Sequence, residues 1–242
     1  MLEAVIFDVD GTIADTECDG HRPAFNAAFA AHGLDIVWSP EEYGRLLAVT
    51  GGQRRIAQYL AVRGYGDGAL RLSDEIHRTK TELFRERILD GAVCARPGLP
   101  ELVDDLRTAG IRIAVATTGR RAWVDPLLAA LLGTDAVEVT VTGDDVTRLK
   151  PDAEVYQRAL RELGVAAPNA LAVEDSAVGL QAALAAGVAT VVVRTEYTAG
   201  QDFTGAAAVR DGFSVGPRDE QSLRASGCRQ AHARWWRERS QK

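Results

Sequence analysis

The sequence contains few cysteines and no long hydrophobic run. Its three cysteines, Cys18, Cys94 and Cys228, lie far apart and form no C-x-x-C pair. This spacing argues against a disulfide framework or a cysteine-bound metal, and it indicates a reducing, cytoplasmic compartment. No apolar stretch approaches the roughly 20 residues that a transmembrane helix requires.

The chain also lacks an excess of positive charge and a basic N-terminal region. Its 242 residues carry a formal net charge of −6, which argues against non-specific binding to nucleic acid or to an acidic membrane surface. The first residues, MLEAVIFD, contain no basic side chain, so a secretory signal is not expected. These absences favour a globular cytoplasmic protein, and we expect it to be a monomer.

Five short apolar runs have the composition of strands that are buried on both faces of a parallel sheet. They lie at residues 2–10, 111–118, 136–143, 170–175 and 189–195. Helical patterns at 98–110, 152–164 and 176–187 lie between these runs, and each ends at a glycine. Strands that alternate with helices of about 10–15 residues predict an α/β fold with a Rossmann-like parallel sheet.

Residues 15–96 show a different pattern, with four helical segments and no convincing strand. Ser39-Pro40-Glu41-Glu42 has the cap residue, the proline and the acidic first turn of a helix start. We therefore expect an inserted four-helix cap domain over 15–96, placed to act as a lid. Residues 1–14 and 97–212 should form the core domain, and the arginine-rich segment 213–242 should be a weakly structured tail.

Polar side chains stand where the predicted strands end, and such strand ends form the ligand site of open α/β sheets. They are Asp8 and Asp10 after the first run, Thr117 and Thr118 in the second, Lys150 before the helix that follows the third, and Glu174 and Asp175 in the fourth. Carboxylates are hard oxygen ligands suited to Mg²⁺, whereas lysine and threonine can hold a phosphate. The set predicts Mg²⁺-dependent phosphoryl transfer.

Most of these residues have a plain structural alternative. Asp8 and Asp10 could open a calcium loop, although Gly11 is in the fourth position and not the sixth, where an EF-hand requires its glycine. Asp175 could serve only as part of a helix cap, Lys150 could be a solvated loop charge, and Thr117 could be an ordinary strand residue. The occurrence of all of them at successive strand ends favours the catalytic interpretation.

Four segments resemble, in order, the four motifs of the haloacid dehalogenase superfamily of phosphotransferases. They are DVDGT (8–12), VATT (115–118), LKPDAEVY (149–156) and VEDSAVG (173–179), and the resemblance covers about residues 1–205. It implies that Asp8 is the nucleophile and Asp10 the general acid and base. It also implies that Thr117 holds the transferring phosphoryl group, that Lys150 offsets negative charge, and that Mg²⁺ is held by Asp8, Asp10, Asp175 and Glu174.

Residues 3–60 and 202–212, together with the inserted helices, resemble the CbbY-like sugar phosphatases. These belong to a subgroup that includes β-phosphoglucomutase and phosphoglycolate phosphatase. The resemblance implies a small sugar phosphate as partner, with xylulose 1,5-bisphosphate as the best single substrate, converted to xylulose 5-phosphate. Glu17 and His21 would then meet sugar hydroxyls, and Thr118 would also contact the substrate.

A bisphosphate requires a second anion site, which we expect on the cap. The candidate is the segment Gly51, Gly52, Gln53, Arg54 and Arg55, in which glycines allow close backbone approach and arginine can bind phosphate through two parallel hydrogen bonds. CbbY-like sequences often carry lysine where this chain has Gln53. The alternatives are two helix-surface arginines and, for His21, an ordinary helix histidine.

Three other functions remain open on the sequence. A β-phosphoglucomutase-like mutase would interconvert sugar monophosphates, whereas a phosphatase would release phosphate. A phosphoglycolate-type phosphatase would use the same chemistry on another substrate. A non-enzymatic binding module could keep the fold, but loss of Asp8 or Lys150 would then be expected, and both are present.

Overall fold

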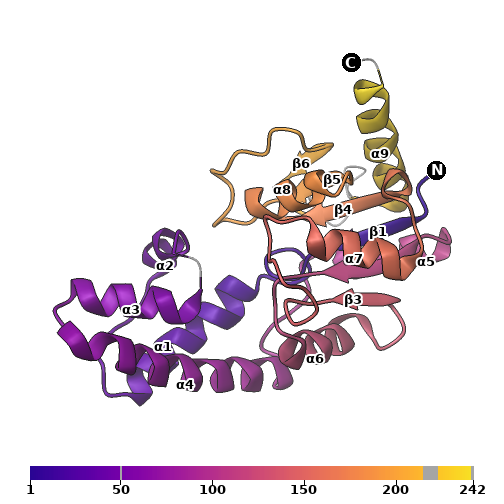
Figure 1. Cartoon of the computed structure of the whole chain (residues 1–242). Helices are drawn as coiled ribbons and strands as arrows, with labels where there is room; N and C mark the ends of the chain where they lie inside the picture. The colour runs from indigo at the N-terminus through magenta and orange to yellow at the C-terminus, as the bar shows by residue number, and fades with distance from the viewer. Residues whose placement is uncertain (50, 215–222, 241–242) are drawn as a thin grey trace. The chain divides into compact units, whose positions relative to one another are not determined.

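The computed structural model describes residues 1–49, 51–214 and 223–240, and the chain divides into two compact units (Figure 1). One unit comprises Met1–Asp15 and Cys94–Lys242, and the other comprises Thr16–Val93. The predicted cap boundaries, 15 and 96, lie close to this division. The chain therefore leaves the first unit after one strand and returns to it after a continuous helical insertion.

The first unit contains a six-stranded parallel sheet in the order β3-β2-β1-β4-β5-β6. Its strands are β1 (Ala4–Phe7), β2 (Arg112–Ala116), β3 (Val139–Val141), β4 (Ala170–Glu174), β5 (Ala189–Val193) and β6 (Ala208–Arg210). The five predicted strands are confirmed, each within its apolar run. β6 was not predicted, because this edge strand has three residues and none of them is fully buried.

Helices cover both faces of this sheet (Figure 1). They are α5 (Leu99–Thr108), α6 (Arg121–Leu132), α7 (Glu154–Leu163), α8 (Ala177–Ala185) and α9 (Ala225–Arg239), with a short 3₁₀ turn, η3, at Ala167–Asn169. α7 and α8 share one buried apolar cluster with β1, β2 and β4. α5 and α9 contact β2, β4 and β5 outside that cluster, which places them on the opposite face. The α/β class with a Rossmann-like parallel sheet is thus confirmed.

The prediction of a weakly structured tail was wrong for residues 225–239, which form α9. Cys228, Ala231, His232 and Trp235 recur at helical spacing and are buried. His232 Nε2 donates to Pro168 O at 2.8 Å, and Trp235 Nε1 donates to the carbonyl of Gly205 at 3.0 Å. The arginine-rich composition concealed this apolar face; residues 215–222 and 241–242 lie outside the described part of the chain.

The second unit contains the four predicted helices. They are α1 (Arg22–Ala31), α2 (Pro40–Leu46), α3 (Gly52–Val62) and α4 (Ala69–Leu89), accompanied by a π-helical segment, η1 (Thr16–His21), and a 3₁₀ turn, η2 (Gly66–Gly68). The predicted helix start is confirmed, since Ser39 Oγ accepts from Glu42 N at 3.1 Å. α4 packs against both α1 and α3. Among the described residues, no helix is long and apolar enough to cross a membrane.

Candidate active site

The candidate site lies at the carboxyl ends of β1, β2 and β4. Phe7 at the end of β1 is in register with Val115 and Val173 on the two flanking strands. The residues that follow therefore leave the sheet at one level, and Asp8 N donates to Val173 O at 3.0 Å. The parallel register is the physical reason why side chains more than a hundred residues apart in the sequence meet here.

Lys150 lies between two carboxylates that the sequence assigned to the site. Its Nζ donates to Asp8 Oδ1 at 2.6 Å and to Glu174 Oε1 at 2.6 Å, and its side chain is only 5% exposed. Burial alone would lower the pKa of Lys150, but Asp8 and Glu174 outweigh it and raise that pKa above its ordinary value. Lys150 is therefore a charged lysine in a nearly dry site and not a solvated loop residue.

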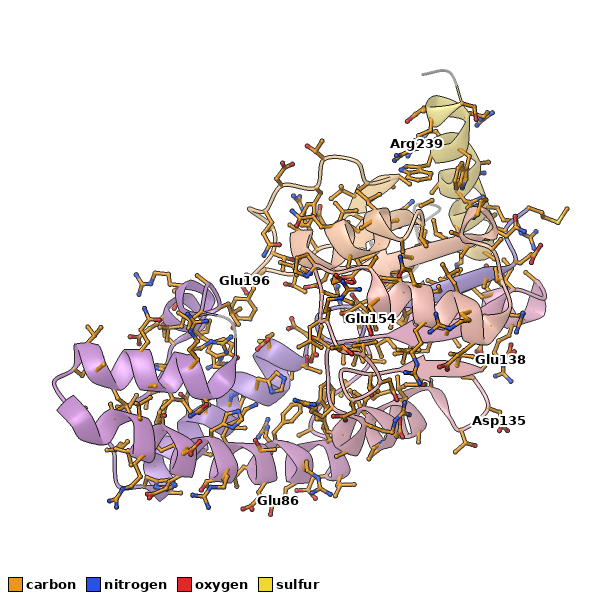
Figure 2. All side chains as sticks on the ribbon, in the orientation of Figure 1. Glu86, Asp135, Glu138, Glu154, Glu196 and Arg239 are labelled. Atoms are coloured by element: carbon orange, nitrogen blue, oxygen red, sulfur yellow. The ribbon has the colours of Figure 1, made fainter. Side chains whose placement is uncertain are left out.

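The loop that carries Lys150 is shaped by Glu154, at the start of α7 (Figure 2). The Glu154 carboxylate accepts from the backbone nitrogens of Thr147 and Arg148, each at 3.0 Å. These two bonds draw the loop onto the first turn of α7, where an acidic side chain is favoured by the helix dipole. The loop geometry thus fixes the backbone from which Lys150 reaches Asp8.

Tyr156 belongs to this site, although the sequence analysis did not select it. It projects from α7 with no exposed surface, and its hydroxyl donates to Glu174 Oε1 at 2.6 Å. A side chain at Gly179 would not fit here, because its Cβ would lie 1.9 Å from Glu174 Oε2. A tyrosine six residues after a motif lysine gives no sequence signal of its own, so only the packing of α7 on the sheet brings it to Glu174.

Three buried carboxylates form a group that could hold a divalent cation. Oxygens of Asp8, Glu174 and Asp175 all lie within 4.8 Å of one another. Burial raises the pKa of Asp8, with a further contribution from Asp10 against the opposing effect of Lys150. Burial, together with Asp8 and Glu174, raises the pKa of Asp175 well above its ordinary value.

The charges in this group favour a resident metal ion. One lysine cannot neutralise three carboxylates, and like charges so close in a dry site are costly unless a cation compensates them. Hard oxygen donors in this number suit Mg²⁺. The residues present therefore fit the magnesium that the sequence led us to expect.

The remaining core residues of the predicted site occupy neighbouring positions. Asp10 is half-buried in the turn after β1, where it pairs with Ala14 in an isolated parallel bridge. Thr117 is fully buried, and its Oγ1 accepts from Gly119 N at 3.0 Å. Thr118 is exposed. Asp10 raises the pKa of Asp8 through its charge, which is consistent with two carboxylates in close proximity.

In the helical unit, Glu17 and Arg55 are linked through Tyr43. The Tyr43 hydroxyl donates to Glu17 and accepts from Arg55 Nη1, the latter at 3.1 Å. Arg55 Nε also donates to the carbonyls of Leu46 at 3.1 Å and Val49 at 3.3 Å. Arg55 is buried, with its guanidinium 5.2 Å from the centre of the Tyr43 ring. Its contacts hold the end of α2, so it is not the surface arginine of the alternative interpretation.

The other residues of the predicted second anion site begin α3. Gly52, Gln53 and Arg54 lie in its first turn, and Gln53 and Arg54 are exposed. Gly51 precedes them with φ +90°, a backbone conformation that favours glycine. The segment therefore combines a glycine turn, a helix N-terminus and an exposed arginine, which is a chemistry suited to an anion.

His21 ends η1 in contact with a buried lysine that the sequence analysis missed. Lys80 Nζ donates to His21 Nδ1 at 2.7 Å, and the His21 ring stacks on Phe84 with centroids 3.9 Å apart. Burial lowers the pKa of His21 to about 3, and Lys80 contributes further. His21 is therefore neutral at physiological pH. Lys80 could not be found from the sequence, because one lysine in an amphipathic helix looks like a surface residue.

Replacing His21 is expected to change the acid sensitivity of the protein. A half-buried histidine that is neutral in the folded state stabilises the fold above its unfolded pKa of about 6.5, and this contribution is lost as pH falls towards 3. For one such group, the free energy of unfolding changes by at most about 1.4 kcal/mol per pH unit. Between pH 7 and 5, the free energy of unfolding should fall less in His21→Gln than in the wild type. Urea unfolding followed by circular dichroism measures this, and equal slopes would contradict it.

The chain matches known proteins over most of its length. The sequence profile of haloacid dehalogenase-like hydrolases matches residues 2–187. Protein CbbY of Rhodobacter capsulatus is 46% identical over 208 residues, which is 85% of this chain and 91% of that protein.

Two solved structures of CbbY from Rhodobacter sphaeroides are also similar. The one in complex with phosphate is 42% identical, with a TM-score of 0.79, and the match covers 95% of this chain and all of that one. A mutant in complex with xylulose-(1,5)bisphosphate is 41% identical, also with a TM-score of 0.79, over 94% of this chain and 99% of that one. With the site geometry above, these matches show that the chain belongs to the haloacid dehalogenase-like hydrolase family and is a phosphatase related to the CbbY proteins.

Proposed function

We propose that this protein is a Mg²⁺-dependent sugar phosphatase that works through an aspartyl-phosphate on Asp8, with xylulose 1,5-bisphosphate as its substrate. The observation that carries the proposal is the position of Lys150, held at 2.6 Å from both Asp8 and Glu174 in a buried cluster with Asp175. A structural ion pair would not require a third buried carboxylate beside it. A phosphoryl-transfer site does, because it must hold both a metal ion and a phosphate.

Asp8 and Asp10 divide the chemistry between them. In the first half, an Asp8 carboxylate oxygen attacks phosphorus, the phosphorus–oxygen ester bond breaks, and Asp10 gives its proton to the departing sugar oxygen. In the second half, a water attacks the phosphoryl group on Asp8 and loses its proton to Asp10. The bond to Asp8 then breaks, inorganic phosphate leaves, and both aspartates return to their starting states.

The other residues would stabilise charge and hold the reacting groups. Lys150 favours the ionised form of Asp8, against the burial that raises the pKa of Asp8, and it offsets the negative charge that gathers on the phosphoryl oxygens. Thr117 would hold the transferring group and Thr118 the substrate. Asp8, Asp175 and the Asp10 carbonyl would hold Mg²⁺, which supplies further charge neutralisation and orients the phosphate.

We assign Glu174 chiefly to the positioning of Lys150. The sequence analysis placed it among the metal ligands, and it is close enough to act as one. However, its Oε1 already accepts from Lys150 and from Tyr156, each at 2.6 Å, and Asp175 N lies 3.3 Å from its Oε2. These bonds fix the carboxylate in one orientation, from which it holds the lysine between two negative charges.

The substrate assignment rests on the relatives and on the helical unit. A CbbY structure from Rhodobacter sphaeroides is a complex with xylulose-(1,5)bisphosphate. A bisphosphate needs a second anion site, and the start of α3 offers Gly51, Gly52, Gln53 and Arg54. Glu17 and His21 would bind sugar hydroxyls. A neutral His21 suits that role because it can donate a hydrogen bond to a hydroxyl and is not repelled by the neighbouring Lys80. We also propose that the protein acts as a monomer in the cytoplasm.

The decisive experiment measures phosphate release from a panel of substrates, with and without Mg²⁺. The panel contains xylulose 1,5-bisphosphate, ribulose 1,5-bisphosphate, β-glucose 1-phosphate and phosphoglycolate. We expect Mg²⁺-dependent release with kcat/KM for the xylulose compound higher by orders of magnitude. Conversion of β-glucose 1-phosphate to glucose 6-phosphate without phosphate release would instead establish the mutase. A preference for phosphoglycolate would support the phosphatase mechanism but contradict xylulose 1,5-bisphosphate as the substrate.

Arg54→Gln is expected to lower activity on bisphosphates more than on monophosphates. If Arg54 binds the distal phosphate, its loss should lower kcat/KM for xylulose 1,5-bisphosphate about 10–100-fold, since a charge-assisted bond contributes roughly 1.5–3 kcal/mol. Hydrolysis of a monophosphate should change less than threefold. Loss of both Arg54 and Arg55 should also lower activity on bisphosphates more than on monophosphates. However, Arg55 holds the end of α2, so the double variant would also disturb the helical unit, and the single variant is the sharper test.

A matched control is Arg71→Gln, which removes an exposed arginine from α4 in the same unit, where its side chain is 89% exposed. This control should leave the hydrolysis of both substrate classes unchanged. Equal losses on bisphosphates and monophosphates in Arg54→Gln would remove Arg54 from the second anion site.

A further inference from the structure

Arg96 binds three backbone carbonyls that meet beside the candidate active site. Its Nη1 donates to Gly11 O at 2.5 Å and to Val193 O at 2.7 Å, and its Nη2 donates to Arg194 O at 2.9 Å. Gly11 belongs to the loop that carries Asp8 and Asp10, whereas Val193 and Arg194 lie at the end of β5. The guanidinium therefore ties the catalytic loop to a strand that contributes no catalytic side chain.

The Gly11 backbone is held from its other side by a proposed metal ligand. Gly11 has φ +79°, and a Cβ there would lie 2.3 Å from Asp175 Oδ2, so the Asp175 carboxylate packs directly on the Gly11 backbone. The peptide that joins Asp10 to Gly11 immediately precedes this contact. A shift of the Gly11 carbonyl would therefore alter the distances between Asp8, the Asp10 carbonyl and Asp175.

The Arg96 side chain has little freedom to take another position. Its backbone nitrogen donates to Ile13 O at 2.9 Å, and the preceding residue, Ala95, pairs with Ala14 in an antiparallel bridge. The guanidinium also lies 5.6 Å from the centre of the Phe213 ring, which is fully buried. The segment that returns from the helical unit thus holds Arg96 in one geometry against the catalytic loop.

The charges around Arg96 agree with such a role. Burial lowers the pKa of Arg96, while the carboxylates of Asp15 and Asp175 favour its charge. A planar guanidinium can direct several N–H bonds at carbonyls that lie in different directions, which a lysine ammonium on a flexible stem cannot reproduce.

We propose that Arg96 is a positioning residue that sets the affinity and geometry of the Mg²⁺ site by holding the Gly11 carbonyl against Asp175 and the end of β5. This inference rests on the proposed function, because it presupposes a magnesium ion at Asp8 and Asp175. Arg96 touches neither the reacting atoms nor the proposed metal ligands through its hydrogen bonds. It acts through the backbone of the loop on which Asp8 and Asp10 stand.

The test measures metal binding directly, by titration calorimetry of Mg²⁺ into the full-length protein without substrate. Partners of metal ligands typically contribute about 10–100-fold to metal affinity or activity. In Arg96→Ala and Arg96→Lys we expect the dissociation constant for Mg²⁺ to rise about tenfold or more. At saturating Mg²⁺, kcat should remain lower than in the wild type, while KM for the sugar phosphate should change less than about threefold, because the change is in the catalytic loop.

A matched control is Arg194→Gln. Arg194 lines the same cavity of about 300 Å³ as Arg96, together with Asp15, Thr195, Glu196 and Asp211, and Glu196 is marked in Figure 2. The Arg194 side chain binds Asp211 Oδ1 at 2.5 Å, so its loss leaves all three carbonyls and Arg96 in place. Mg²⁺ affinity and kcat should stay within about twofold of the wild type, since a surface ion pair contributes little.

Guanidinium ion provides a second readout that a general loss of stability would not give. Arg96 lines this cavity, so Arg96→Ala would leave the space of the deleted guanidinium group open to it. Added at low millimolar concentration, guanidinium should partly restore Mg²⁺ affinity and kcat to Arg96→Ala and should not affect Arg194→Gln. If Arg96→Ala is unfolded at 25 °C, the calorimetric test uses Arg96→Lys, which keeps the positive charge but not the planar set of N–H donors.

The outcomes separate this inference from the function on which it rests. A wild-type protein that binds no Mg²⁺ would overturn the proposed metal site and, with it, the role of Arg96. Wild-type binding together with unchanged Mg²⁺ affinity in folded Arg96 variants would overturn the role of Arg96 alone. A lower melting temperature with unchanged affinity would likewise reduce Arg96 to a structural residue.

Discussion

Asp8→Asn is expected to lower kcat by about 10⁴-fold or more, because an amide cannot replace the carboxylate nucleophile. The substitution keeps the size of the side chain, and its amide oxygen can still accept from Lys150. The fold and the binding of the sugar phosphate should therefore persist. Phosphate release measures the first expectation, and calorimetric titration with the substrate measures the second.

The mechanism also predicts the loss of a covalent intermediate in this variant. Wild-type protein mixed briefly with substrate and quenched in acid should carry one phosphoryl group on Asp8, detectable by mass spectrometry of peptides, whereas Asp8→Asn should carry none. Asp135→Asn, an exposed aspartate before β3 (Figure 2), is the matched control and should behave as wild type. Turnover in a variant whose mass confirms the amide would remove Asp8 from the nucleophile's role.

Lys150→Met is expected to affect both activity and stability. The substitution leaves Asp8 and Glu174 without the cation that lies 2.6 Å from each. Breaking a buried ion pair from one side typically costs about 3–5 kcal/mol. We expect kcat to fall about 10³-fold, in the range seen when one preorganised stabilising group is removed.

The stability deficit of Lys150→Met should depend on pH in a defined direction. Burial already raises the pKa of Glu174 to about 7, and Lys150 opposes that rise. Without the lysine, the pKa values of Glu174 and Asp8 in the folded state should rise further above their unfolded values. The folded variant then binds more protons than the unfolded chain, so its stability falls as pH rises. The loss relative to wild type should be larger at pH 8 than at pH 6.

Thermal unfolding at the two pH values, with and without Mg²⁺, measures this deficit. Added Mg²⁺ should recover part of it, because the metal ion supplies positive charge to the same carboxylates. Arg148→Met is the matched control, since it removes a cation from the same loop. The Arg148 side chain is 68% exposed and pairs with Asp152 and Glu154 at the surface. A deficit in Lys150→Met that is independent of pH would contradict the proposed charge balance.

The core of the site could be predicted because each of its residues follows a recognisable strand or precedes a recognisable helix. Asp8, Glu174 and Asp175 were selected from their positions after apolar runs, and the register of β1 with β4 brings them together. Lys150 was selected from its place before α7, and its two ion pairs agree with that choice. Tyr156 and Arg96 were missed, since nothing in a single sequence distinguishes them from ordinary helix and loop residues.

In the helical unit, the elements could be predicted but the contacts of single side chains could not. Its helices were predictable from periodicity and from the Ser39 cap, but the environments of individual polar residues were not. Arg54 and Arg55 are neighbours in the sequence, yet Arg54 is exposed and Arg55 is buried against Tyr43 and the end of α2. The 100° rotation between successive helical residues separates them, and the position of the neighbouring helices decides which one is covered.

The sequence by itself determined the class of this protein: short apolar runs alternating with helices require a parallel sheet, and the order of acids, threonine and lysine at its strand ends indicates phosphoryl transfer. Only the tertiary structure decided what each charge contacts. It placed Lys150 between Asp8 and Glu174, and it directed the Arg96 guanidinium at the Gly11 carbonyl. The reason is physical: periodicity reports burial within about one turn or one strand, whereas partners 85–142 residues apart meet only when the whole sheet is in register.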